Sequence, residues 1–328
     1  MEQENKTNAG STPFDDVFRT LVVEHSKLLI NLINEMFPGT NYTGKEKTIP
    51  LNETYFINKE SGEQDKRILD SALAIISSDG TEKIFHLECQ STSDGSMILR
   101  VFEYDTQLAL KTSSIVDSNI LEVTMPTTGI LFLRSTSSTS DKMTIKVNSP
   151  DEKSVSYEIP IMKLRNYDCD IILEKELYFL IPFYLFNFEA DFDKIEAGDM
   201  TVIESFRKRF SELYERLKER LENGRIDVMT HHSIIMLTKK VIAALAKSKS
   251  TVKEEADKIM GGQVLDYETK VIFREGLQQG IEQGFENGFE SGKIIARFED
   301  GMSIEEIAEK TKVSAETVKS ILSKERLL

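Results

Sequence analysis

The sequence predicts a mixed α/β domain that is followed by a helical extension. Roughly the first 180 residues carry helical and strand periodicities in the order helix, three strands, helix and further strands. From about Val202 the composition changes to charged helical repeats, beginning with VIESFRKRFSELYERLKERLEN. A chain of 328 residues is also long enough for two or three units that each have a core.

The α/β part opens with an amphipathic helix over PFDDVFRTLVVEHSKLLINLINEMFPG, which Pro38 and Gly39 end. A strand is predicted at KTIPLNETYFIN, and a hairpin of two more strands within residues 69–92. A second helix, DGSMILRVFEYDTQLALKT, precedes strands at GILFLRS, KMTIKVNS and VSYEIPIMKLR. The apolar run ELYFLIPFYLFNF is compatible with a strand or with a buried helix.

These elements divide the chain into five expected segments. They are a disordered tail (1–12), an α/β domain (13–200), a helical hairpin (201–262), a glycine-repeat helix or linker (263–292) and a helix-turn-helix-like module (293–328).

Composition points to a soluble cytoplasmic protein. The 41 basic side chains are outnumbered by 55 acidic ones, and the net charge of -14 opposes non-specific attraction to nucleic acid, so any DNA contact must be local. The two cysteines, Cys89 and Cys169, form neither a disulfide framework nor a CxxC metal pattern. The opening MEQENKTNAGST has no apolar signal-peptide core, and no apolar run is long enough to span a membrane.

The predicted hairpin carries Asp70 on its first strand and Glu88 with Gln90 on its second. The length of its loop, within SSDGT, decides how they face each other. With the two-residue loop DG, Asp70 faces Cys89 and lies across the sheet from Glu88. With the three-residue loop SDG and Gly80 in the left-handed region, Asp70 lies directly opposite Glu88, and Gln90 shares their face.

Two facing carboxylates repel each other, and a divalent cation would compensate for their charge. Two carboxylates, the Cys89 backbone carbonyl and waters suit Mg²⁺ or Mn²⁺, which polarises a phosphate and activates a water. Gln90 would orient that water or a phosphate oxygen. The alternative is structural: Asp70 caps a strand, and Glu88 with Gln90 forms an exposed polar face.

An aspartate on one strand and Glu-x-Gln on the next, inside this element order, resembles the PD-(D/E)XK (restriction-endonuclease-like) fold. The opening FDDVFRTL, the strand ending HLECQ, and Arg100 one turn before Tyr104 resemble its bacterial recombination-promoting nuclease and transposase-like branch. The resemblance covers roughly residues 13 to 190, with the glycine repeat and the tail.

The resemblance implies a Mg²⁺-dependent DNA endonuclease that acts in recombination or mobile-element biology. It makes Asp70 and Glu88 metal ligands and Gln90 the third motif residue. Arg100 is a candidate nucleic-acid contact, and the alternative is that Arg100 and Tyr104 cover the sheet. Asp16, at the start of the first helix, and Tyr104 are accessory positions.

Gln90 stands where most of the superfamily has lysine. Neutral glutamine is no cationic stabiliser, so catalysis would be slower or would use another cation such as Arg100. The rival interpretation is a DNA-binding or assembly protein that kept the fold and lost turnover. RNA as substrate is a further open alternative.

His86 shares the strand face of Glu88 and Gln90. A proton relay is one role that this allows, and a hydrogen-bonded sheet histidine is the commoner one. His231 and His232 are adjacent on a helix and point about 100° apart, so without a third ligand they form no metal site.

Glycines recur every fourth residue in EGLQQGIEQGFENGFESGK, from Gly276 to Gly292. A helix loses ~0.8 to 1 kcal/mol at each relative to alanine, so it needs a partner whose backbone approaches closely. We interpret this segment as a site of homo-oligomerisation. The alternative is a flexible polar linker.

The tail SIEEIAEKTKVSAETVKSIL resembles helix-turn-helix modules, in which the second helix enters the major groove. Ser303 and Glu306 form a capping box at its first helix. The candidates to contact DNA are Lys312, Thr317 and Lys319. Residues 293–328 contain seven basic and seven acidic side chains, and this neutrality leaves a small packing or dimerisation bundle as the alternative.

Overall fold

The structure is a computed structural model. It describes residues 12–58, 64–91, 95–260, 294–295, 297–298, 302–311, 314–315, 318–319 and 322, and it describes 52–58 and 64–71 by their backbone alone. The chain divides into two compact units, Met1–Gly262 and Gln263–Leu328.

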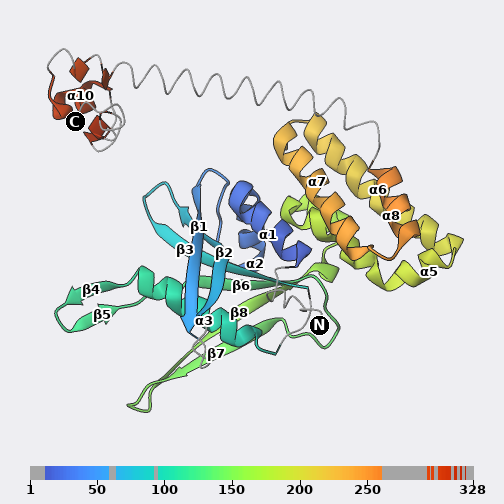
Figure 1. Ribbon diagram of the computed structural model, residues 1–328, viewed down its shortest axis with the longest axis horizontal. Coiled ribbons are helices and arrows are strands. Elements are labelled where there is room, and N and C mark those ends of the chain that lie inside the picture. Colours follow the sequence, from blue (N-terminus) through green and yellow to red (C-terminus); the bar gives the residue numbers. More distant parts are fainter. Residues whose placement is uncertain are drawn as a thin grey trace, which may run out of the picture. The chain divides into compact units, whose positions relative to one another are not determined.

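The first unit is built on a six-stranded mixed sheet in the order β1-β2-β3-β6-β8-β7 (Figure 1). The strands are β1 (Lys47–Asn58), β2 (Gln64–Ile76), β3 (Glu82–Gln90), β6 (Thr127–Phe132), β7 (Lys142–Asn148) and β8 (Ser154–Lys163). β1, β2 and β3 are successively antiparallel, β3, β6 and β8 are parallel, and β7 is antiparallel to β8. The parallel step from β3 to β6 requires a crossover, which contains helix α3 (Met97–Lys111).

Both faces of this sheet are covered, which confirms the predicted mixed α/β class. Alternate residues of β3 point to opposite faces. Phe85 and Leu87 enter the large core that also contains the helices before and after the sheet. On the other face, Met97 and Val101 of α3 pack with Ile130 of β6 in a smaller core.

The first predicted helix is broken, so the expectation of one continuous helix is wrong. Its parts are α1 (Pro13–Glu24), the 3-10 turn η1 (Ser26–Leu28) and α2 (Leu29–Met36). α1 packs on β2, whereas α2 packs on β8. A straight helix could not follow both strands, and a hydrogen bond of 2.7 Å between the hydroxyls of Ser26 and Thr48 holds the turn against β1.

The apolar run at 178–191 is helical, so of the two predicted alternatives, a strand or a buried helix, the second is confirmed. It forms a 3-10 helix, η3 (Tyr178–Asp191), that is buried on nearly all sides and contains Pro182. Because proline has no N–H to donate, it interrupts regular α-helical bonding. An apolar surface around the whole helix is expected for such a buried element.

Three longer helices follow η3: α6 (Met200–Glu222), α7 (Val228–Leu245) and α8 (Ser250–Ile259). α7 contacts both η3 and α1, and Phe206, Phe210 and Val241 join the large core beside the sheet. The region expected to be a helical hairpin therefore shares one core with the α/β part. Short elements complete this unit: η2 (Leu164–Asn166), α4 (Cys169–Glu174) and α5 (Phe192–Glu196).

A small hairpin that the sequence reasoning did not predict projects from the end of α3, away from the main sheet (Figure 1). Its strands are β4 (Ser114–Asp117) and β5 (Ile120–Glu122), and every residue in them is exposed. Ile115, Val116, Ile120 and Leu121 are among the exposed apolar side chains.

The second unit contains helix α10 (Ile304–Thr311). The predicted capping box at its start is present: the Ser303 N–H donates to Glu306 Oε2 (2.9 Å), and the Glu306 N–H donates to Ser303 Oγ (3.3 Å). A small core follows, made of Ile294, Ile307, Val318 and Leu322. The glycine repeat lies outside the described residues. None of the helices in the described ranges is long and apolar enough to cross a membrane.

Candidate active site

The turn between β2 and β3 has three residues, which confirms the second loop alternative. Ala72 pairs with His86, and the Ser77 N–H donates to the Thr81 carbonyl (2.9 Å). The Gly80 N–H donates back to the Ser77 carbonyl (2.9 Å), and Gly80 has φ +83°, the left-handed conformation that glycine adopts without strain. In this register the side chain of Ala72 lies on the same face of the sheet as His86, Glu88 and Gln90.

Asp70 belongs to β2, two residues before Ala72. Its side chain lies outside the described residues, and the pairs of the β2–β3 register end at Ala72 with His86. The facing of Asp70 and Glu88 therefore stays a prediction.

Glu88 is the outer end of a hydrogen-bonded chain that runs into the sheet. His86 Nε2 lies 3.1 Å from Glu88 Oε1, and His86 Nδ1 lies 2.7 Å from Asp105 Oδ1. Thr128 Oγ1 donates to the same Asp105 oxygen (2.7 Å). The side chains of His86 and Asp105 are fully buried, whereas that of Glu88 is 16% exposed. The chain thus joins β3, α3 and β6 and ends at a partly accessible carboxyl group.

Both ring nitrogens of His86 face carboxyl oxygens. An ionised carboxylate only accepts hydrogen bonds, so both contacts require an imidazolium ring that donates twice. Burial is the largest influence and favours the neutral ring, but the hydrogen bonds and charges of Asp105 and Glu88 outweigh it and raise the pKa of His86 to about 9. His86 is therefore protonated at neutral pH and offsets part of the negative charge around Glu88.

Asp105 is a site residue that the sequence reasoning missed. The signal was present, because Asp105 lies in the buried stripe that Met97, Val101 and Leu108 form along α3, where a charged residue is rarely found without a partner. Within the part of the chain that the structure describes, its second oxygen, Oδ2, has no hydrogen-bond partner.

Tyr104 and Arg100 lie on α3, and both are half-buried. The Tyr104 ring meets the His86 ring edge to face, with centroids 5.9 Å apart. Tyr104 therefore packs on the ring in the middle of the hydrogen-bonded chain. Arg100 precedes it by one turn.

Gln90 ends β3 and is almost buried, with 9% of its surface exposed. The Leu133 N–H donates to its backbone carbonyl (2.9 Å). The side chain of Cys89 packs on the opposite core, as the alternation predicts, and burial raises the pKa of its thiol.

Arg134 fixes the chain just after Gln90. Its Nη1 donates to the Ser91 carbonyl (2.7 Å), and its Nε and Nη2 donate to the Glu189 carboxylate (2.5 and 2.7 Å). No sequence pattern links Arg134 to Ser91 and Glu189, which lie 43 and 55 positions away from it.

Asp16 lies in the first turn of α1 and is half-buried. Because α1 packs on the sheet face opposite α3, the structure assigns Asp16 to the other layer from the chain of Glu88, His86 and Asp105. Its accessory role stays a prediction.

The described residues contain no group of three or more histidine, cysteine, aspartate or glutamate side chains arranged to hold a metal ion. His86 is an unsuitable ligand because both its nitrogens are engaged. The Glu88 carboxylate is a hard oxygen donor of the kind that Mg²⁺ binds.

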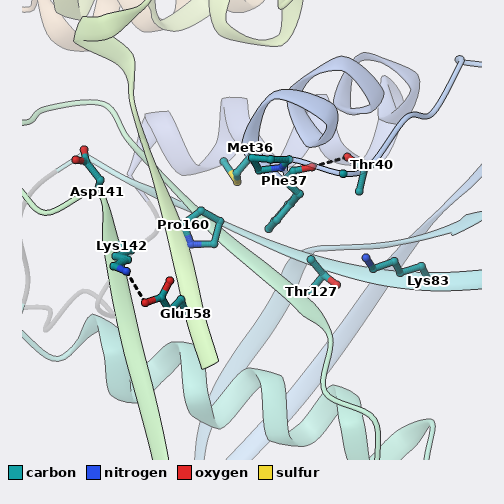
Figure 2. Close-up of a pocket in the computed structure, with 11 residues that line it drawn as sticks. Met36, Phe37, Thr40, Lys83, Thr127, Asp141, Lys142, Glu158 and Pro160 are labelled. Atoms are coloured by element: carbon teal, nitrogen blue, oxygen red, sulfur yellow. Dashed lines mark hydrogen bonds and ion pairs between the residues drawn. The ribbon is translucent and has the colours of Figure 1, made fainter. Parts of the chain in front are cut away.

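A surface groove of about 620 Å³ lies at the opposite end of β3 (Figure 2). Lys83 and Thr127, at the starts of β3 and β6, line it, and Lys142 and Glu158 form an ion pair of 2.5 Å at its side. Lys83 precedes Glu88 by five residues along the strand, which is roughly 17 Å. The groove is therefore distinct from the candidate site.

In the second unit, Lys319 is exposed at a helical position beside the buried Val318. Lys312 and Thr317 lie outside the described residues. Lys319 is thus the one predicted DNA contact of the tail whose exposure the structure describes.

The family of sigma-70, region 4, which is of the helix-turn-helix type, matches residues 293–324. This match supports the predicted helix-turn-helix-like module and covers most of it. No curated protein and no solved structure matches the chain.

Proposed function

We propose that this chain is a metal-dependent DNA endonuclease with a PD-(D/E)XK-like core. The observation that carries the proposal is the position of Glu88. It lies on β3, the strand that follows a β-hairpin and precedes the α3 crossover to the parallel strand β6. This order of elements is the one that the resemblance implies for the two acidic motif residues.

Asp70 supplies the second carboxylate in this proposal. Each described pair from Ala72 with His86 to Ile76 with Glu82 follows one register. Two further residues in the same register would bring Asp70 opposite Glu88, where directly opposed side chains have Cβ atoms about 5 Å apart. The β1–β2 pairing shifts its register over this stretch, from Leu51 with Ala72 to Glu53 with Leu69, so the facing of the two carboxylates requires that the β2–β3 register continues past this shift.

Asp70 and Glu88 would hold Mg²⁺ or Mn²⁺ through carboxylate oxygens, with the Cys89 backbone carbonyl as a third donor. When bound, the ion supplies charge neutralisation on a phosphate and a water that is easier to deprotonate. The partial exposure of Glu88 is consistent with this role, because a buried carboxylate would be out of reach of DNA.

Gln90 and α3 supply the remaining groups. The Gln90 amide both donates and accepts hydrogen bonds, so it would orient a water or a phosphate oxygen without adding charge. Arg100 provides a cation on the helix that covers this face, and Tyr104 holds the His86 ring.

The C-terminal module would bring the enzyme to DNA. Sigma-70, region 4 is of the helix-turn-helix type, whose second helix enters the major groove. Lys312, Thr317 and Lys319 are the proposed contacts. Because the module is neutral, one copy would bind weakly, and two copies joined through the glycine repeat would bind more tightly.

The test is incubation of the full chain with supercoiled plasmid and Mg²⁺ or Mn²⁺, beside Asp70→Ala and Glu88→Ala. We expect the wild type to nick or linearise the plasmid and both variants to lose the activity. Asp117→Ala, which removes an exposed carboxylate from β4, is the matched control and should cleave like the wild type. Equal cleavage by Glu88→Ala and wild type, with circular dichroism unchanged, would contradict the assignment.

A second candidate is a DNA-binding or assembly protein that has lost turnover. Gln90 in the lysine position and the match to sigma-70, region 4 favour it. It predicts that all the proteins leave the plasmid intact and still retard labelled DNA in a gel. The same gel with single-stranded RNA of equal length tests the RNA alternative.

A further inference from the structure

We propose that His86, Asp105 and Thr128 are positioning residues that hold the Glu88 carboxylate ready for a divalent cation. This inference rests on the proposed nuclease function and names residues outside the acidic pair. We call these three residues the relay.

The first step is the orientation of Glu88. A glutamate side chain has several rotatable bonds, so binding a ligand costs conformational entropy unless the side chain is already ordered. The hydrogen bond from His86 Nε2 engages Glu88 Oε1 at 3.1 Å. Oε2 is then the oxygen left to bind a cation.

The second step is the rigidity of His86. Its ring is fully buried, and Asp105 Oδ1 binds Nδ1 at 2.7 Å. Tyr104 packs edge to face on the ring. The ring therefore cannot rotate without breaking a short hydrogen bond and displacing packed side chains.

The third step is the support of Asp105. Thr128 of β6 donates to the same oxygen that accepts from His86, also at 2.7 Å. Thr128 is the neighbour of His86 in the parallel β3–β6 register. Three elements thus converge on one carboxylate oxygen, and the position of Glu88 depends on α3 and β6 as well as on β3.

Groups of this kind, which hold a metal ligand without touching the metal, commonly change metal affinity when they are removed. The relay should therefore affect cation binding more than DNA binding. A purely structural role for the relay would instead lower stability and leave the affinity of the folded protein for the cation unchanged.

The experiment measures Mn²⁺ binding to the full chain by the electron paramagnetic resonance signal of free Mn²⁺, at a temperature where circular dichroism shows every variant folded. Glu88→Ala should abolish Mn²⁺ binding. Asp105→Asn should weaken the same binding by about tenfold. Asp117→Asn makes the same chemical change on exposed β4 and should bind like the wild type.

Thr128 gives a second pair of variants if Asp105→Asn does not fold. Thr128→Val removes the hydroxyl and keeps the branched shape, and it should weaken Mn²⁺ binding several-fold, whereas Thr128→Ser should restore it. Retardation of labelled DNA without metal should be equal in all variants.

Two outcomes separate failure of the relay from failure of the proposed function. If the wild type shows Mn²⁺ binding that Glu88→Ala loses, and folded Asp105→Asn and Thr128→Val bind as tightly as the wild type, the relay is wrong and the nuclease proposal stands. If Glu88→Ala binds Mn²⁺ like the wild type, the metal site is wrong, and the relay is overturned with it.

Discussion

Replacing His86 by alanine removes the ring that joins Glu88 on β3 to Asp105 on α3. Asp105 then keeps its Thr128 hydrogen bond but loses its cationic partner while it remains fully buried. Breaking a buried ion pair in this way costs about 3–5 kcal/mol. The pKa of His86 gives a second measure, because the rise from 6.5 to about 9 corresponds to about 3 kcal/mol of stability.

Chemical unfolding at pH 7 tests this magnitude. The chain contains no tryptophan, so far-UV circular dichroism is the appropriate signal. We expect His86→Ala to lower the free energy of unfolding by about 3 kcal/mol or more. In the double variant with Asp105→Ala, the total loss should be smaller than the sum of the two single losses by about 1–3 kcal/mol, because the residues are in direct contact.

The sign of the pH dependence follows from the raised pKa. Because the folded state holds the His86 proton more tightly than the unfolded state does, this stabilisation is fully present below about pH 6.5 and is lost as the pH rises through about 9. The difference in stability between wild type and His86→Ala should therefore shrink over that interval. His232→Ala is the control, since burial lowers the pKa of this half-buried histidine. Additive losses, or a difference that is constant from pH 6 to 9.5, would refute the paired imidazolium.

Two further predictions concern glycines whose replacement the structure opposes for different reasons. A Cβ at Gly129 of β6 would lie 2.1 Å from Met36 Sδ and 2.8 Å from Phe37 Cζ. Gly129→Ala should therefore lower the free energy of unfolding, measured thermally or chemically, by about 1–3 kcal/mol. An unchanged stability would mean that Met36 and Phe37 move aside without cost. At Gly80, a Cβ meets no atom within 4 Å, but φ is +83°, so Gly80→Ala should cost about 1 kcal/mol and Gly80→Asn less. Equal losses for alanine and asparagine would argue against the left-handed turn.

The local elements followed from sequence patterns because their causes are local. β1 has the predicted bounds, and α3 and the capping box at Ser303 lie where their periodicity and caps indicate. The three-residue turn SDG was one of two loops that the sequence left open, and the structure decided between them. The nuclease assignment itself came from a resemblance, and its acidic pair stays a prediction because the side chain of Asp70 lies outside the described residues.

The sequence by itself determined the alternation of β3, and with it the shared face of His86, Glu88 and Gln90. Only the tertiary structure decided what meets that face. The break at His25 depends on which strands α1 and α2 contact, and the protonation of His86 depends on Asp105, 19 residues away on a helix that crosses the sheet. A buried histidine is neutral or charged according to the groups that lie beside its two nitrogens. Which groups lie there depends on how the helices pack on the sheet, and local sequence patterns do not determine this packing.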